Sequence, residues 1–276
     1  MPFYTISRYF KITGLLLLIS ILCACEDVIH VDLDTGEPRL VVDAEILWRN
    51  ETTGSNQEIY LSRLTEYYNE ETTKVSDANV IIKNEAGDEF IFSETETPGT
   101  YACTNFIPAI GAQYQLEITV DGEVYTATET MIGSPEIKRI EQKSDGGFLG
   151  KDNQISIFYD DPANEDNYYL TRYDTNFLQY PYYSLTDGDF YDGNEIEDSF
   201  SDEDLEVGER IDITFRCISE QFYNYITLIN ESSSDNPFGT PPANIRGNII
   251  NQTNANHFAF GYFRLSEAKV TEYTFQ

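Results

Sequence analysis

Basic residues and histidines are scarce in this chain. Its 276 residues include 17 Lys and Arg against 48 Asp and Glu, and the formal net charge is −31. A surface this negative repels the phosphates of nucleic acids and disfavours anionic lipid, so we expect no nucleic-acid partner. The 2 histidines, His30 and His257, are too far apart in the sequence to form a spaced pair of metal ligands.

Catalytic motifs are also absent. The chain has no Gly-x-Ser-x-Gly, no His-Glu-x-x-His, no phosphate-binding glycine loop and no dinucleotide fingerprint. Pairs of carboxylates are common, but 48 acidic residues produce such pairs by chance, so they do not indicate a glycosidase. We therefore expect a protein that binds its ligand and is not an enzyme.

Cysteine is rare, with 4 residues in the whole chain. Cys23 and Cys25 lie near the N-terminus, and Cys103 and Cys217 lie in alternating apolar segments. The last two either form one long-range disulfide in an oxidising compartment or remain two buried thiols. We favour two thiols, because nothing in the sequence brings the pair together.

No apolar run is long enough to cross a membrane. Arg8 and Lys11 precede the apolar stretch Gly14–Leu22, whose nine residues would extend about 14 Å as a helix, against a hydrocarbon core of ~30 Å. This arrangement predicts a cleaved export signal at residues 1–24. It resembles a bacterial lipoprotein signal, with Leu three residues before the acylated cysteine and a small residue directly before it, which assigns the lipid to Cys25. The alternative is an ordinary secretory signal.

Short alternating segments follow an acidic stretch at residues 25–36, which we interpret as the tether. An Asp121-Gly122 pair joins two of these segments and is a strong hairpin signal, since both turn positions tolerate positive φ. About seven short strands in ~100 residues predict an immunoglobulin-like antiparallel β-sandwich over residues 37–133. The expected strands are 40–47, 58–62, 78–82, 89–92, 100–103, 113–120 and 123–128.

A second β-rich domain is predicted from 134 to 276. Residues 154–159 and 168–173 are expected to pair as strands, and 210–217 and 257–263 are further expected strands. One helix is predicted near 219–231, with Ser219 as its N-cap. Its apolar face repeats at i, i+3, i+4 and i+7 through Phe222, Tyr225, Ile226 and Ile229.

Two acidic loops are candidates for a cation site. Asp187, Asp189 and Asp192 lie on a glycine-bent segment, and closely spaced carboxylates and carbonyls are the ligands that Ca²⁺ prefers. The spacing departs from the EF-hand pattern. A second acidic loop covers residues 160–166. A weak calcium site and two solvated loops are both open interpretations.

Tyrosines are concentrated between residues 159 and 191. Tyrosine combines a large apolar area with a polar group, which is typical of protein interfaces and of sugar stacking. The alternative is that alternating strands direct many of these rings into a core. The candidate partner- or ligand-binding residues are Tyr168, Tyr169, Tyr182, Tyr183 and Tyr191.

Three segments near the C-terminus form a recognisable ending. They are Asn236-Pro237-Phe238, Pro241-Pro242-Ala243-Asn244-Ile245-Arg246-Gly247-Asn248-Ile249 and Phe260-Gly261-Tyr262-Phe263. Further motifs precede them in order along the chain: the lipid cysteine, Pro38-Arg39-Leu40-Val41-Val42, Gly99-Thr100-Tyr101, the Asp121-Gly122 hairpin and the helix. Together they resemble a Bacteroidota lipoprotein family known as domain of unknown function 4249.

The resemblance implies a location more than an activity. Members are outer-membrane lipoproteins, often encoded beside TonB-dependent receptors, and the family provides no catalytic residues to carry over. Glu26-Asp27 after the cysteine resembles the acidic signal that directs such lipoproteins to the cell face. We expect a non-catalytic accessory of a TonB-dependent β-barrel receptor. A free-standing carbohydrate-binding or adhesion protein is the alternative, and a surface hydrolase is a third.

Overall fold

The computed structural model describes residues 38–64, 73–233 and 245–276. The predicted export signal at 1–24, the predicted lipidation site Cys25 and the predicted tether at 25–36 lie outside these residues. The described segments belong to a single unit, residues 37–276. None of the helices in them is long and apolar enough to cross a membrane.

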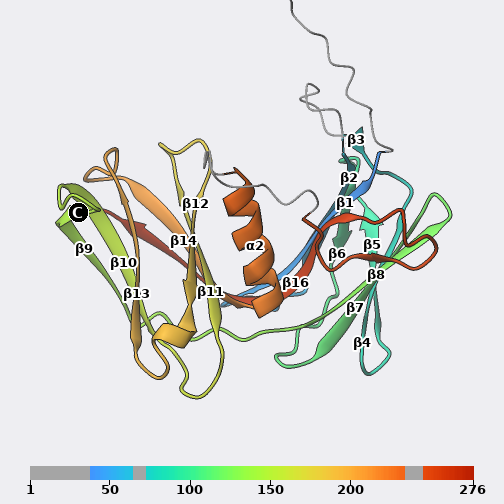
Figure 1. Ribbon diagram of the computed structural model, residues 1–276, viewed down its shortest axis with the longest axis horizontal. Helices are drawn as coiled ribbons and strands as arrows, with labels where there is room; N and C mark the ends of the chain where they lie inside the picture. Colours follow the sequence, from blue (N-terminus) through green and yellow to red (C-terminus); the bar gives the residue numbers. More distant parts are fainter. Residues whose placement is uncertain (1–37, 65–72, 234–244) are drawn as a thin grey trace, which may run out of the picture. The chain divides into compact units, whose positions relative to one another are not determined.

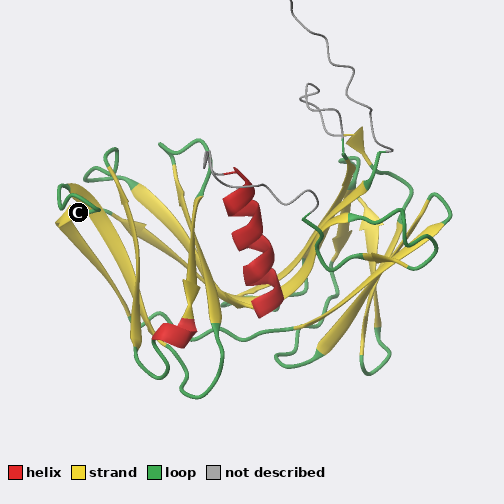
Figure 2. Cartoon of the chain, in the orientation of Figure 1, coloured by secondary structure: helices red, strands yellow, loops and turns green. Residues whose placement is uncertain are grey.

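Strands dominate the described residues, which hold one α-helix and one short 3-10 helix (Figure 1; Figure 2). The predicted mostly β class with one helix is therefore confirmed. The elements are β1 (Leu40–Arg49), β2 (Gln57–Arg63), β3 (Thr73–Lys74), β4 (Asn79–Asn84), β5 (Glu89–Glu94), β6 (Thr100–Cys103), β7 (Gln113–Val120), β8 (Glu123–Thr130), β9 (Arg139–Gly146), β10 (Asp152–Asp160), β11 (Tyr168–Thr175), β12 (Tyr182–Asp187), η1 (Gly188–Phe190), β13 (Glu195–Asp202), β14 (Arg210–Ile218), α2 (Glu220–Ser233), β15 (Ile250–Asn251) and β16 (Phe260–Thr274).

The strands form a large mixed sheet and a small antiparallel sheet. The large sheet has the order β12-β11-β14-β16-β1-β2-β6-β5-β4-β7-β8-β15, with β3 beside β2, and the small sheet has the order β13-β10-β9. Strands β1 and β16 are parallel, in register from Val41 opposite Phe260 to Arg49 opposite Ala268. The strands at the two ends of the chain are therefore neighbours.

The large sheet changes layer at β5. Residues 89–92 pair with β4, whereas residues 93–94 pair with β6. Strands β1, β2 and β6 consequently share a hydrophobic core with β4, β7 and β8. Because side chains alternate along a strand, Val42 and Ala44 of β1 are buried in this core while Asp43 is exposed on the other face.

The predicted hairpin between β7 and β8 is present. The two strands pair from Gln113 with Thr130 to Val120 with Glu123. The turn residues Asp121 and Gly122 have φ values of 54° and 79°. Positive φ at both central positions is the type I′ geometry that suits the twist of a hairpin.

The small sheet packs against the other end of the large sheet around a second hydrophobic core. The predicted pairing of 154–159 with 168–173 is wrong, because β10 pairs with β9 and β13 while β11 pairs with β12 and β14. The rings of Tyr159 and Tyr169 are instead 4.8 Å apart across the core. Both segments have buried apolar positions because they face each other from different sheets.

Strand β16 begins at Phe260, three residues later than the expected strand 257–263, and continues to Thr274, well beyond it. Its first part pairs with β1, and its last part pairs with β14, from Ala268 with Arg216 to Thr274 with Arg210. It contributes Phe263 to the first core, and Phe275, directly after it, belongs to the second. The predicted domain boundary between residues 133 and 134 stays a prediction. Strand β16, which lies after that boundary, pairs with β1, which lies before it.

Helix α2 confirms the predicted helix. The hydroxyl of Ser219 accepts a hydrogen bond from the backbone N–H of Phe222 at 3.3 Å, as expected for an N-cap. The helix packs on the outer face of the large sheet, where Phe222 lies 4.8 Å from the ring of Tyr262. Cys103 and Cys217 are free buried thiols, in the first and second core respectively.

Candidate binding site on the outer face of β1 and β2

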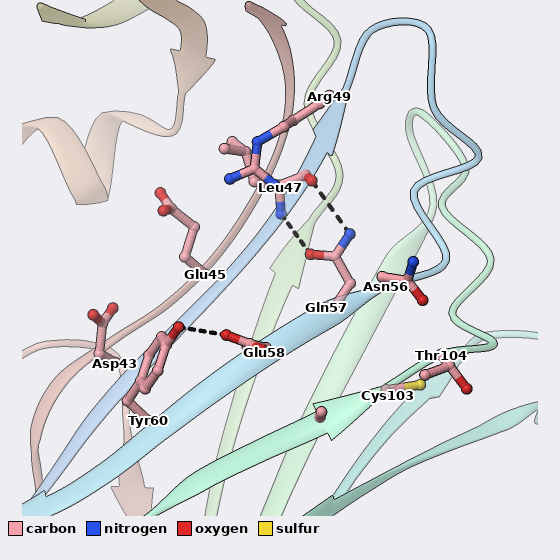
Figure 3. A pocket seen from close by; sticks show the side chains of 11 residues that line it. Asp43, Glu45, Leu47, Arg49, Asn56, Gln57, Glu58, Tyr60, Cys103 and Thr104 are labelled. Atoms are coloured by element: carbon pink, nitrogen blue, oxygen red, sulfur yellow. Dashed lines mark hydrogen bonds between the residues drawn. The ribbon is translucent and has the colours of Figure 1, made fainter. Parts of the chain in front are cut away.

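A hollow lies on the outer face of the large sheet, where β1 and β2 separate. The two strands are in register only from Leu40 opposite Arg63 to Asp43 opposite Tyr60. Beyond that point the strands border a hollow (Figure 3). Its volume is about 460 Å³. Such a volume falls within the usual size of a small-ligand site.

The amide of Gln57 bridges the separated strands. Its Oε1 accepts a hydrogen bond from the backbone N–H of Leu47 at 3.0 Å, and its Nε2 donates to the Leu47 carbonyl at 3.2 Å. Nε2 also donates to the carbonyl of Gly54 at 2.8 Å. Gln57 thus satisfies buried backbone groups that the missing strand pairing leaves open.

Polar side chains line most of this hollow. Because β1 alternates, Asp43 and Glu45 point away from the first core and toward the hollow. Glu58 and Tyr60 reach it from β2, and β6 and the residues after it close one side. The lining residues are Asp43, Glu45, Leu47, Arg49, Asn56, Gln57, Glu58, Tyr60, Ala102, Cys103 and Thr104.

Two arginines from the C-terminal half of the chain hold the carboxylates of β1. Arg216 of β14 lies 2.9 Å from Glu45 Oε1, and Arg264 of β16 lies 3.1 Å from the same oxygen. Arg264 also contacts Asp43 at 2.9 Å. Burial favours a raised pKa for Glu45, but the two guanidinium groups hold that pKa below its usual value. Glu45 is therefore ionised and fixed in position.

Tyr60 presents its ring at the edge of the hollow. Its hydroxyl donates a hydrogen bond of 2.6 Å to Glu58 Oε2 (Figure 3). This bond, with partial burial, raises the pKa of Tyr60 to about 12. The side chain is nonetheless 47% exposed, so an aromatic surface with a fixed orientation faces the solvent.

Charges in and around the hollow balance. Three carboxylates, those of Asp43, Glu45 and Glu58, line the hollow together with the guanidinium of Arg49. The guanidinium groups of Arg216 and Arg264 do not line it, but they pair with Glu45 and Asp43 and bring the number of positive groups to three. The sum is zero, although the whole chain has a formal charge of −31. With Glu45 held ionised and Tyr60 held protonated, these groups suit hydrogen bonding to a ligand more than proton transfer.

Two of the three predicted cation residues accept backbone hydrogen bonds, and one of these bonds joins two loops. Asp187 Oδ1 accepts the backbone N–H of Asp189 at 3.0 Å, and Asp192 Oδ1 accepts that of Asn164 at 2.6 Å. The two predicted acidic loops therefore contact each other. In the described ranges no group of three or more His, Cys, Asp or Glu is placed to hold a metal ion. The structure does not bring the three aspartates together as one ligand set.

The five predicted tyrosines do not form one exposed face. Tyr169 is fully buried and donates to Asp161 Oδ1 at 2.6 Å, so its assignment to an accessible binding face is wrong. Tyr168 packs against the helix, 4.9 Å from the ring of Tyr223, and Tyr191 packs against the second core. Alternation along β11 accounts for the opposite positions of Tyr168 and Tyr169.

Tyr182 and Tyr183 keep about half of their surface exposed, at 45% and 48%. They are consecutive on β12, so their side chains point to opposite faces of the strand. The ring of Tyr182 lies 5.4 Å from Phe200 in the second core. Tyr183 pairs with Arg172 on the other face. A partner at this edge would therefore contact each ring from a different side.

Sequence reasoning missed the hollow. Two of its carboxylates are on β1, and the arginines that hold them are about 170 to 220 positions away along the chain. One signal was available: Asp43 and Glu45 occupy alternate positions of an otherwise apolar strand. Charged residues on the outer face of a central strand indicate ionic partners on its neighbours.

Comparisons with known proteins identify a family and a distant likeness of fold. The family described as Domain of unknown function (DUF4249) matches residues 26–272. No curated protein shows significant sequence similarity to the chain. A segment of two fibronectin type III domains from chicken tenascin is 12% identical, with 66% of this chain and 91% of that chain covered and a TM-score of 0.22. A cytokine receptor complex is 9% identical, with 85% and 95% covered and a TM-score of 0.26.

Proposed function

This chain belongs to the DUF4249 family, and we propose that it is a lipid-anchored protein of the outer-membrane surface that binds a ligand for a TonB-dependent uptake system. In this role it is a non-catalytic accessory of a β-barrel receptor. The ligand is held on the outer face of β1 and β2, and the receptor takes it up.

The membrane location follows from the N-terminal sequence. Acyl chains on Cys25 would hold the mature chain at the membrane, with ~0.8 kcal/mol for each buried CH₂ group. Confinement to the membrane plane raises the effective concentration of the domain near a receptor in the same membrane. The net charge of −31 disfavours a resting position on anionic lipid, which leaves a protein surface as the preferred contact.

One observation carries the binding role. The hollow beside Gln57 combines a half-exposed aromatic ring, that of Tyr60, with charged and amide groups on rigid strands. Ligand sites are concave and hold a few polar groups in fixed positions. We take the hollow as the capture site.

We infer that residues 37–133 form an immunoglobulin-like sandwich that carries this site. The inference draws on the first core, which is shared by two layers of mostly antiparallel strands, and on the type I′ hairpin at Asp121-Gly122. In this arrangement the capture site lies on an outer face of a sandwich layer and not in its end loops.

The receptor partnership is tested by mild detergent extraction of the tagged full-length protein, with and without crosslinking. We expect a large β-barrel receptor to be recovered with it. Replacement of Tyr182 and Tyr183 by Ala should weaken that recovery, because these half-exposed rings are at an edge strand of the large sheet. Tyr180→Ala is the matched control, since Tyr180 is 75% exposed in the preceding loop.

Two results would contradict this proposal. If Cys25→Ser leaves membrane fractionation unchanged, the lipid anchor is wrong. If the lipoprotein is recovered alone, in several detergents and with crosslinking, the proposed partnership with a receptor is wrong. The second result leaves a free-standing surface binder, an alternative favoured by the same hollow, because its lining residues need no receptor to bind a ligand.

A further inference from the structure

We propose that the ligand of the hollow is a neutral saccharide, bound with a sugar ring against Tyr60 and its hydroxyls on the carboxylates and donors around it. This inference deepens the proposed binding role and rests on it. It draws on the charge balance of the site, its unused hydrogen-bonding groups and the position of the tyrosine ring.

Charge balance separates the site from the rest of the molecule. The three carboxylates that line the hollow are offset by Arg49, which also lines it, and by Arg216 and Arg264, which pair with Glu45 and Asp43. In the whole chain, acidic residues outnumber basic ones almost three to one. A cationic ligand would find stronger sites elsewhere on the surface, and an anionic ligand would meet the long-range repulsion of the molecule. A neutral polar ligand is neither attracted to the acidic surface elsewhere nor repelled by the net charge of the molecule.

Unused hydrogen-bonding groups of both kinds line the hollow. Arg216 and Arg264 pair with Glu45 at Oε1, and Arg264 pairs with Asp43 at Oδ1. Within the described chain the second oxygen of each carboxylate accepts no hydrogen bond. Among the donors, the guanidinium of Arg49 and the amide of Asn56 likewise have no hydrogen-bond partner there. Sugar hydroxyls both donate and accept, so they can satisfy both sets.

The ring of Tyr60 supplies the apolar surface. A sugar ring has C–H groups on its faces and hydroxyls around its edge, and an aromatic side chain is suited to contact such a face. The hydrogen bond to Glu58 fixes the ring before any ligand arrives, so little side-chain entropy is lost on binding. Ligand hydroxyls would then reach Asp43 and Arg49 on the neighbouring strand.

The floor of the hollow is rigid. Leu47 is buried and is held to Gln57 by two hydrogen bonds, and β1 is paired with β16 on its other side. A site on paired strands positions its groups more accurately than a loop does. A volume of about 460 Å³ accommodates one or two sugar rings.

The test uses the full chain with Cys25→Ser, so that no acyl group is present, and isothermal titration with defined probes. The probes are neutral di- and trisaccharides of glucose, mannose, galactose and xylose, a galacturonic acid trimer and a glucosamine trimer. We expect one neutral series to bind with an affinity that changes little between low and high salt. Tyr60→Ala should weaken it about tenfold, the size of a lost aromatic contact.

Two further variants make the result specific. Glu58→Gln keeps the size of the side chain and should weaken binding through the altered hydrogen bond to Tyr60. Tyr180→Ala, at an exposed loop, should bind as the parent protein does. The idea is overturned if no neutral saccharide binds, if a charged probe binds more tightly than every neutral one, or if Tyr60→Ala retains full affinity. None of these results affects recovery of a receptor, so the two proposals fail separately.

Discussion

The side-chain amide of Gln57 takes the place of a strand neighbour for Leu47, bonding both its N–H and its carbonyl at 3.0 and 3.2 Å. Ordinary pairing of β1 with β2 ends four residues earlier on β1, at Asp43. Because the Gln57 side chain makes the hydrogen bonds that a neighbouring backbone would otherwise make, the two strands separate without leaving buried polar groups unpaired. The hollow beside Tyr60 depends on this arrangement.

Replacement of Gln57 by Ala should therefore destabilise the protein. The variant leaves two buried backbone groups of Leu47 without partners, at about 1–3 kcal/mol for each group. Urea unfolding measures the change in the free energy of unfolding. Gln179→Ala, at an exposed glutamine, is the control and should stay within about 0.5 kcal/mol of the parent. Equal stability of the two variants would show that water replaces the Gln57 amide without loss.

Glu45→Gln should destabilise the protein in a pH-dependent way. The neutral amide leaves the buried Arg216 without its carboxylate, a change of about 3 kcal/mol. In the parent protein the pKa of Glu45 is lowered from 4.5. Its stabilising contribution is fully present above that unfolded-state pKa and is lost as the pH falls through the lower folded-state pKa.

The measurement is urea unfolding of both proteins between pH 3 and pH 7. The stability difference should be constant near neutral pH and shrink as the pH falls below the unfolded-state pKa of 4.5. Glu85→Gln, at an exposed loop position, should show no such trend. A difference that stays constant down to pH 3 would mean that the charge of Glu45 does not contribute.

Alternation of side chains explains which strands could be predicted. The segments of β1, β7, β8, β10, β11 and β14 each place apolar residues on one face or both, and each was expected. Strands β9, β12 and β13 were not. All three are at sheet edges, where a strand needs less apolar surface. In β13 the pattern Ile196, Asp198, Phe200 is also interrupted by a charged residue that the fold buries.

The candidate site was harder to predict than the fold. The concentration of tyrosines from Tyr168 to Tyr191 indicated a binding face, but composition does not say which face of a strand a ring occupies. Tyr169 is in fact buried in the core. The hollow requires contact between β1 and two strands near the other end of the chain. The parallel pairing of β1 with β16 that brings them together has no local sequence signature.

Calcium binding at the 187–195 loop has a direct test through Asp189→Asn. Asp187 and Asp192 accept backbone hydrogen bonds, whereas the carboxylate of Asp189 accepts none from residues 38–64, 73–233 and 245–276. Its replacement therefore leaves these loop contacts intact. Desolvation and the neighbouring charges, led by Asp187, raise the pKa of Asp189, and a bound cation would relieve this repulsion. A calcium site at this loop predicts that calcium raises the melting temperature of the parent more than that of the variant at fixed ionic strength. Equal responses would leave a solvated loop.

The buried carboxyl of Asp198 should change the stability of the protein with pH in the direction opposite to that expected for Glu45. Asp198 is 4% exposed in the second core. The hydroxyl of Thr171 donates a hydrogen bond to Asp198 Oδ2, and the hydroxyl of Tyr173 donates one to the backbone carbonyl of Asp198 at 3.1 Å. Burial raises the pKa of the carboxyl from 3.8, and the hydrogen bonds only partly offset it. The folded state therefore keeps its proton to a higher pH than the unfolded state, and stability falls as the pH rises from 3.8 through the folded-state pKa.

Asp198→Asn retains an acceptor for Thr171 and has no charge to bury, so this decline should disappear. Across the window in which only the unfolded state is ionised, the stability of the variant relative to the parent should rise by at most about 1.4 kcal/mol per pH unit. Urea unfolding from pH 4 to pH 8 measures it, with the exposed Asp204→Asn as control. If the free energy of unfolding changes with pH in the same way for the parent and for Asp198→Asn, then water or a rearranged neighbour solvates the carboxylate. Water would in that case reach the second core.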